Sequence, residues 1–362
     1  MEYQHGGDIY TNCVTMDYSA NINPLGIPAG VREAVYQAAD QCFCYPDSQS
    51  ASLRGKLAKF HDVSMETIIC GNGAADLIFQ VVSAVRPKEA LLMAPSFLEY
   101  EQALHSVSCN ITYYDLKEEQ GFALREEELI AWIEESGRFF QMIFLCNPNN
   151  PTGFALKKDQ LKTILDYCRQ KHIFLVMDEC FNEFLEDPQQ HSVLEFLRKG
   201  AYKQVFLLKA FTKIYAMAGI RLGYGICNDN QMIDRIHQIR QPWSVSSIAQ
   251  AAGEAALEET AYVEATRSLI ACEREYLKES LTALGFLVYD SMANYIFFKD
   301  LRAQALQEEK ILYQQLLLKK VLIRSCANYR GLDSTYYRIC VKQRKENDEF
   351  LSVLKSILTE RK

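Results

Sequence analysis

Short runs of apolar residues alternate, through the middle of the chain, with stretches whose apolar residues recur at helical spacing. The runs that predict strands are TIIC (67–70), ALLMAP (90–95), MIFLCN (142–147), IFLVMD (173–178), VFLL (205–208) and GYGIC (223–227). Between them, LKKDQLKTILDYCRQKH (156–172) has the three- and four-residue spacing of an amphipathic helix. This alternation predicts an α/β fold, with a mainly parallel sheet covered by helices on both faces.

From about residue 255 the pattern changes. A long charged helical stretch (259–285) precedes FLVYDSMANYIFF (286–298), VLIRSC (321–326) and YYRICV (336–341), which predicts a smaller α+β domain. The first 40 residues look irregular. We therefore expect an N-terminal segment (1–44) that packs on the small domain, a large domain (45–254) and a small C-terminal domain (255–362).

Composition narrows the classes of function. The chain has 362 residues, 49% of them hydrophobic, and a net charge of −7 without a long basic run, so we discount nucleic-acid binding. No apolar run approaches the roughly 20 residues of a membrane span. The first ten residues, MEYQHGGDIY, lack an apolar secretory core. The twelve cysteines are scattered without zinc-site spacing, which predicts reduced thiols, no structural metal and a cytoplasmic location.

Polar residues follow several predicted strands at the point where each strand ends. They are Gly71-Asn72-Gly73, Asn147, Asp178 and, slightly further on, Lys213. In parallel α/β sheets, ligands bind beyond the carboxyl ends of the strands. These positions therefore predict one ligand site.

The three segments before Lys213 each have a functional and a structural interpretation. Gly71–Ala75 could present backbone N–H groups to an anion at a helix start, or could be an ordinary tight turn. The rigid loop Asn147–Gly153 could present the amide of Asn150, or could be a plain connection. Asp178 could pair with a buried cation, or could cap a helix.

The segment KAFTKIYAMAGIRLGYG (209–225) adds a lysine and an arginine. A lysine in apolar surroundings has a lowered pKa, and its neutral amine can form a Schiff base with an aldehyde. Arg221 could bind a phosphate through its fork of donors. An aldehyde and a phosphate occur together in pyridoxal phosphate (PLP). The alternative for Lys213 is a solvated charge at a strand end.

The motifs GNGAA (71–75), NPNNPTG (147–153), DECF (178–181) and FTKIYAMAGIRLGYG (211–225), in this order, resemble those of fold type I PLP-dependent enzymes, the aspartate aminotransferase superfamily. The likeness covers nearly the whole chain. It implies that Lys213 binds the cofactor aldehyde, that Asp178 pairs with the pyridine nitrogen and that Asn150 hydrogen-bonds the ring hydroxyl oxygen. Phe97 would stack on the ring. The residues implied to bind the cofactor phosphate are Gly73, Ala74, Ala75, Thr212 and Arg221.

Several further segments resemble those of one branch of the superfamily, the L-threonine-O-3-phosphate decarboxylases of cobalamin synthesis, which are relatives of histidinol-phosphate aminotransferases. These segments are HGGD (5–8), DYSANINPLGIP (17–28), YPDSQSASLRGKLA (45–58), PSFLEYEQAL (95–104) and VLIRSCANYRGL (321–332). Phe181 also favours this branch, because the aminotransferases usually have tyrosine there. The residues that the resemblance assigns to the substrate are His5, Asn23, Arg324 and Arg338.

One pair of residues departs from the branch. Lys209-Ala210 stands where the branch usually has arginine followed by a serine or threonine that binds the cofactor phosphate. One phosphate bond is then missing, unless Lys209 or water replaces it.

The resemblance implies a PLP-dependent decarboxylase of threonine phosphate or serine phosphate. The implied partner is a small phosphorylated amino acid. Neither a nucleic acid nor a membrane is expected as a partner. The resemblance also implies a homodimer with shared sites, because Tyr45 would reach the cofactor phosphate of the neighbouring subunit. One alternative is a histidinol-phosphate type aminotransferase; a catalytically silent PLP-binding protein is another.

Overall fold

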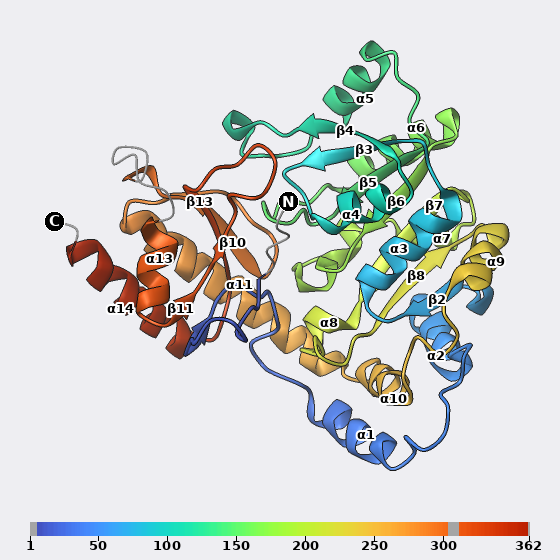
Figure 1. Cartoon of the computed structure of the whole chain (residues 1–362), viewed down its shortest axis with the longest axis horizontal. Coiled ribbons are helices and arrows are strands. Elements are labelled where there is room, and N and C mark those ends of the chain that lie inside the picture. Colours follow the sequence, from blue (N-terminus) through green and yellow to red (C-terminus); the bar gives the residue numbers. More distant parts are fainter. Residues whose placement is uncertain (1–5, 303–310, 361–362) are drawn as a thin grey trace.

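The computed structural model describes residues 6–302 and 311–360. A large domain built on a seven-stranded sheet lies beside a smaller part that contains the C-terminal strands and helices (Figure 1). In the described residues, no helix combines the length and the apolar character that crossing a membrane would require.

The seven-stranded sheet is mainly parallel, as the sequence predicts. In spatial order its strands are β2 (Ile68–Gly71), β8 (Gly223–Cys227), β7 (Val205–Ala210), β6 (Phe174–Asp178), β5 (Met142–Cys146), β3 (Glu89–Ala94) and β4 (Asn110–Asp115). Only β8 runs against the others in this sheet. The edge strand β4 was not predicted, because its side chains are only half-buried or exposed and form no continuous apolar run.

Helices cover both faces of this sheet, which confirms the predicted layering. Successive strand residues alternate between two apolar clusters: Ile143 packs in one and Phe144 in the other. The helices of one face are α3 (Ala74–Val85), α4 (Glu99–Ser106) and α9 (Asn230–Ile239). Those of the other face are α5 (Glu126–Glu135), α6 (Lys158–Lys171) and α7 (Leu194–Arg198).

The C-terminal part is an α+β unit around a four-stranded antiparallel sheet. Its strands, in spatial order, are β12 (Arg324–Ser325), β13 (Tyr336–Cys340), β10 (Tyr295–Lys299) and β9 (Leu287–Val288). Its helices are α11 (Thr260–Ala283), α13 (Ile311–Leu318) and α14 (Arg344–Glu360).

The start of the chain takes part in both units. Strand β1 (Met16–Asp17) pairs in parallel with β11 (Val321–Leu322) of the C-terminal part. The expectation that the first 40 residues are irregular is wrong, because α1 (Ala29–Ala39) is a helix that packs on α10 (Ser247–Ala256). Helix α1 buries only Val31 and Ala38, so its apolar pattern is weak.

Helix α2 (Ala51–His61) precedes β2. The remaining elements are short: α8 (Phe211–Ile214), η1 (Met65–Thr67), η2 (Glu118–Gln120), η3 (Asn182–Phe184) and η4 (Pro188–His191).

Candidate functional site

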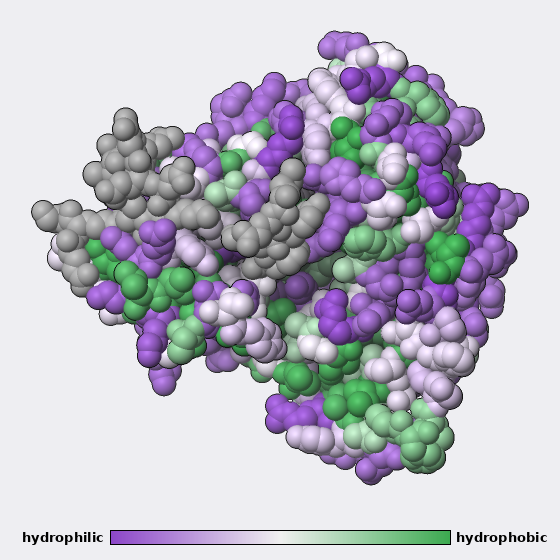
Figure 2. Space-filling view, in the orientation of Figure 1, coloured by the Kyte–Doolittle hydropathy of each residue, from purple (hydrophilic) through white to green (hydrophobic). Residues whose placement is uncertain are grey.

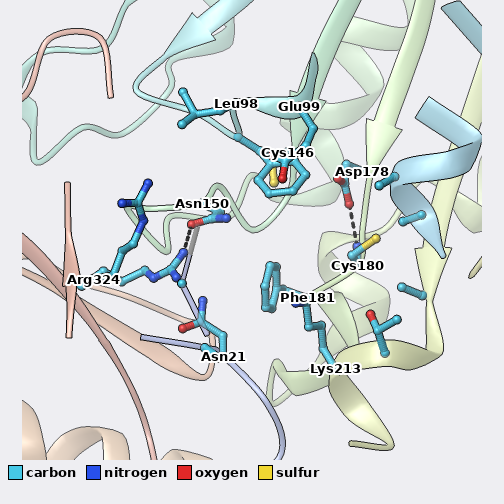
Figure 3. Close-up of a pocket in the computed structure, with 18 of the residues that line it drawn as sticks. Asn21, Leu98, Glu99, Cys146, Asn150, Asp178, Cys180, Phe181, Lys213 and Arg324 are labelled. Carbon is cyan, nitrogen blue, oxygen red and sulfur yellow. Dashed lines mark hydrogen bonds between the residues drawn. The ribbon is translucent and has the colours of Figure 1, made fainter. Parts of the chain in front are cut away.

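A pocket lies where the parallel strands of the large sheet end. Asp178 ends β6, Cys146 ends β5 and Ala210 ends β7, and all three line it. Arg324 of the C-terminal part lies opposite Asp178 across the pocket (Figure 3), and Arg338 of the same part also lines it. Asp178 and Lys213, which the sequence predicted to meet here, both line the pocket, whereas Asn147 does not and instead donates to the His191 carbonyl at 2.7 Å.

Lys213 lies on α8, directly after β7, and its side chain reaches this pocket. Burial lowers the pKa of Lys213, and the positive charges of Arg338 and Arg221 lower it further. Its Nζ lies 5.9 Å from the ring centre of Phe181 and makes no hydrogen bond or ion pair with another described residue. A lowered pKa shifts the amine toward its neutral form, which is the form that attacks an aldehyde.

Asp178 is 4% exposed and held by two hydrogen bonds. The Tyr100 hydroxyl donates to its Oδ2 at 2.7 Å, and the Cys180 backbone N–H donates to its Oδ1 at 2.9 Å. Burial and the charge of Asp178 raise the pKa of Tyr100, so the phenol keeps its proton and donates it. The carboxylate is thus fixed at the floor of the pocket, where it can pair with a cationic ring nitrogen.

An anion cradle lies at the start of α3. Gly73 caps this helix with φ +82°, and a side-chain Cβ there would stand 2.5 Å from a terminal nitrogen of Arg221. A Cβ on Gly223 would stand 2.6 Å from the Ala74 amide nitrogen. The two glycines therefore let the arginine and the first N–H groups of α3 approach the same point. Thr212, which lines the pocket with Ala74 and Ala75, adds a hydroxyl.

The departure at Lys209-Ala210 has a clear structural outcome. Ala210 lines the pocket and offers no hydroxyl there. Lys209 instead bonds Glu183 at 2.9 Å and Glu179 at 3.3 Å, and it lines a different pocket with His61. The suggestion that Lys209 replaces the missing phosphate bond is therefore wrong, because adjacent strand residues point to opposite faces.

Two buried arginines stand side by side on the other wall. Arg324 and Arg338 are direct partners in the β12–β13 register, and each is 5% exposed. Arg338 donates to Asn150 Oδ1 and, at 2.8 Å, to the Ser19 carbonyl. Its Nε has no hydrogen-bond partner among the described residues.

Arg324 is held in place by its own neighbours. It donates to the Ser325 carbonyl and to Asn328 Oδ1, each at 2.8 Å, and its guanidinium lies 5.1 Å from the ring centre of Tyr329. A cation held in this way can bind an anion without reorganising.

Two rings line the pocket on different sides. Phe97 lies edge-on to Tyr100, with ring centres 5.5 Å apart, and Phe181 lies edge-on to Tyr295, with ring centres 5.2 Å apart. Both Phe97 and Phe181 line the pocket, which suits a flat aromatic ligand.

Three described residues assigned to the site from the sequence are not among those that line this pocket: Gly73, which caps α3 beside Arg221, Asn23 and Tyr45. The Asn23 backbone N–H donates to the Lys213 carbonyl at 3.1 Å, and its side-chain amide donates to the Ile214 carbonyl and to Thr266 Oγ1, each at 2.7 Å. Tyr45 is 81% exposed and stacks on Trp243. His5 lies outside the described residues.

Sequence reasoning missed several lining residues, among them Asn21, Glu99 and Tyr329. It also missed Tyr100, which orients Asp178. The signal for Glu99 and Tyr100 was available, since both follow Phe97 closely in PSFLEY (95–100), just beyond the end of β3.

Together these groups fit PLP. Lys213 suits its aldehyde, Asp178 its pyridine nitrogen and Asn150 its ring hydroxyl. The cradle suits its phosphate, because the absence of a Cβ on Gly73 and Gly223 lets Arg221 and the first N–H groups of α3 approach the same point.

Comparison with known proteins agrees with this geometry. The family model described as aminotransferase class I and II matches residues 14–354. Threonine-phosphate decarboxylase from Salmonella typhimurium is 35% identical over 98% of this chain and 96% of its own length. The adenosylcobalamin biosynthesis bifunctional protein CobDQ from Leptospira interrogans is 33% identical over 94% of this chain, which corresponds to 38% of that protein.

A solved structure also matches along nearly the full length. The histidinol-phosphate aminotransferase from Clostridium acetobutylicum superposes with a TM-score of 0.85 at 30% identity, covering 95% of this chain and 99% of that one. The sheet, its flanking helices and the C-terminal unit are therefore shared with an aminotransferase as well.

Proposed function

Because the chain belongs to the class I and II aminotransferase family, we propose that it decarboxylates L-threonine O-3-phosphate, or serine phosphate, to the amino-alcohol phosphate. The similarity to threonine-phosphate decarboxylase over almost the whole length supports this reaction. The similarity to a bifunctional protein of adenosylcobalamin biosynthesis supports a place in that pathway.

The cofactor is PLP, the cofactor of this family. When bound, it withdraws the electron pair left at the substrate α-carbon when a bond there breaks. Lys213 would hold its aldehyde carbon until the substrate amine takes that place. Asp178, fixed by Tyr100, would keep the proton on the pyridine nitrogen. Asn150 would contact the ring oxygen, with no help from Phe181, which has no hydroxyl to donate.

The main observation that supports a phosphorylated amino acid as the substrate is the Arg324–Arg338 pair. Two buried guanidinium groups on neighbouring strands fit a substrate with two anionic groups, such as the carboxylate and phosphate of a phosphorylated amino acid. By resemblance, Arg338 would bind the carboxylate and Arg324 the phosphate. The hold of Arg324 could turn the substrate until its carboxylate bond stands perpendicular to the cofactor ring, which favours loss of carbon dioxide.

The alternative is transamination of histidinol phosphate, favoured by the similarity to an aminotransferase of known structure. It would use the same cofactor residues and would differ in requiring a keto-acid acceptor. A silent PLP-binding protein is disfavoured, because Lys213, Asp178, Asn150 and Arg221 are all present and line one pocket. Threonine and serine phosphates differ by one methyl group, which a hydrophobic pocket distinguishes by only about 1–3 kcal/mol.

Arg324→Ala should erase most of the preference for the phosphate ester. A charge-assisted contact to a phosphate dianion is worth roughly 1.5–3 kcal/mol, or about 10- to 150-fold in kcat/KM. We expect this loss with threonine phosphate, whereas the low activity on threonine itself should change little. Measuring kcat/KM for both compounds, as carbon dioxide released without a keto acid, tests the proposal.

Arg330→Ala is the matched control for Arg324→Ala. Arg330 lies in the same segment but is exposed and pairs with Asp115 outside the pocket. An unchanged preference for the phosphate ester in Arg324→Ala would contradict the assigned role.

We further propose a cytoplasmic homodimer with shared sites that takes neither nucleic acid nor membrane as a partner. All twelve cysteines are free, as in a reducing compartment. Large aromatic side chains are exposed at Tyr36, Phe43, Tyr45 and Trp243, and Figure 2 shows hydrophobic residues gathered over α1 and the turn after it. A second copy would bury this surface and place Tyr45 near its cofactor phosphate. A sedimentation measurement that shows a stable, fully active monomer would contradict the proposed homodimer.

A further inference from the structure

Glu99 is a titratable side chain of the pocket to which the mechanism above gives no task. It begins α4, two residues after Phe97, and it lines the pocket together with Lys213 and Arg324. In Figure 3, Glu99 and Leu98 enter from one side of the pocket, whereas Lys213 and Phe181 lie on the other. A substrate bound near Lys213 would therefore have Glu99 on its far side.

Decarboxylation requires a proton donor other than the substrate, whereas transamination does not. When the bond between the α-carbon and the carboxylate breaks, carbon dioxide leaves and the electron pair stays behind, so the α-carbon must take up a proton that the substrate does not supply. In transamination, one base can remove the substrate's own proton and return it. Burial lowers the pKa of Lys213, which favours its neutral form, a proton acceptor, more than in water.

We propose that Glu99 donates the proton that replaces the carboxylate on the substrate α-carbon. The O–H bond of its carboxylic acid breaks and a C–H bond forms at the α-carbon, using the electron pair left by carbon dioxide. The Glu99 carboxylate then takes a proton from water before the next turnover. This role rests on the proposed decarboxylase activity.

The surroundings of Glu99 keep an acid available near neutral pH. Burial raises its pKa to about 7, against the charges of Lys213 and Arg324, and the charge of Asp178 raises it as well. Among the described residues, Cys146 on β5 and Tyr329 after β12 also interact electrostatically with Glu99, and burial raises the pKa of both, so they stay neutral. A donor whose pKa lies near the working pH is the most effective general acid.

Glu99→Gln tests this role, because glutamine keeps the size of the side chain but has no acidic proton. With threonine phosphate and the PLP-loaded enzyme, we expect kcat to fall by on the order of 10²- to 10⁴-fold, with KM and cofactor loading nearly unchanged. In the wild type, kcat should decrease as pH rises through about 7, and the variant should lose this limb. Glu99→Asp, which keeps an acid, should recover part of the rate.

Glu101→Gln is the matched control, since Glu101 lies on the same helix but does not line this pocket. It should leave both kcat and its pH profile unchanged.

A second readout needs neither cofactor nor substrate. Because folding raises the pKa of Glu99 from 4.5 to about 7, the folded protein binds more protons than the unfolded chain between these values, and stability falls as pH rises through this window. In the cofactor-free protein, the thermal midpoint of the wild type should therefore drop relative to that of Glu99→Gln from pH 4.5 to 7 and then level off.

The outcomes separate the two proposals. If the wild type releases carbon dioxide but Glu99→Gln keeps kcat within about threefold and retains the same pH profile, the role of Glu99 is overturned and the decarboxylase function stands. If the wild type releases none, both fail. A pH-independent difference in thermal midpoint would overturn the assignment of Glu99 as the titrating acid.

Discussion

Replacing Lys213 with alanine should abolish turnover and remove the visible absorbance that PLP gains when it is joined to a lysine. Lys213 is the lysine that lines the pocket, and its pKa is lowered there by burial. Its Nζ bonds no other described residue, and alanine suits a helix, so the fold should survive. Absorbance, circular dichroism and carbon dioxide release from threonine phosphate check this result.

Lys203→Ala is a suitable control, because Lys203 is an exposed lysine just before β7. It should retain both colour and activity. Normal yellow colour with full turnover in Lys213→Ala would end the assignment of Lys213 as the residue that binds the cofactor.

Replacing Asp178 with asparagine should cost roughly 10³-fold or more in kcat, about 4 kcal/mol, with a smaller loss of cofactor binding. The carboxylate stabilises charge that develops only as the substrate bond breaks, so its removal acts mainly on the transition state. Asparagine can still accept from the Cys180 N–H, which limits structural damage. Steady-state rates and cofactor titration measure the two effects separately.

Tyr100→Phe provides the comparison for Asp178→Asn. It removes the hydrogen bond to Asp178 Oδ2 but leaves the carboxylate charge in place. We expect a loss of at most about tenfold, ~1.4 kcal/mol. If Asp178→Asn also stayed within tenfold of the wild type, the role of the Asp178 charge would be misassigned.

The central part of the fold was predictable because its strands are buried on both faces. Such strands appear as continuous apolar runs, and six of them were found within one or two residues of their observed bounds. The chain places a polar residue directly after several of these runs, so Asp178 and the turn at Gly73 could be located from sequence alone. Lys213 was found for the same reason.

What could not be predicted depends on pairings between distant segments. The β12–β13 register brings Arg324 beside Arg338, and nothing local in either sequence specifies that contact. Arg338 meets Asn150 across 188 positions of the chain. Edge strand β4 and helix α1 were missed because each buries few side chains.

Lys209 shows how strand geometry overrides sequence proximity. It stands four positions before Lys213, but the alternation of β7 turns its side chain to the opposite face, where it joins Glu179 and Glu183. Only Ala210 and Thr212 of that neighbourhood remain beside Lys213 in the pocket.

The most direct test of the central claim is a paired assay with the purified, PLP-loaded enzyme. One reaction contains threonine phosphate or serine phosphate without a keto acid, and the other contains histidinol phosphate with 2-oxoglutarate. We expect carbon dioxide and the amino-alcohol phosphate in the first reaction and no glutamate in the second. Glutamate in the second reaction with no carbon dioxide in the first would contradict the decarboxylase account and establish the aminotransferase in its place.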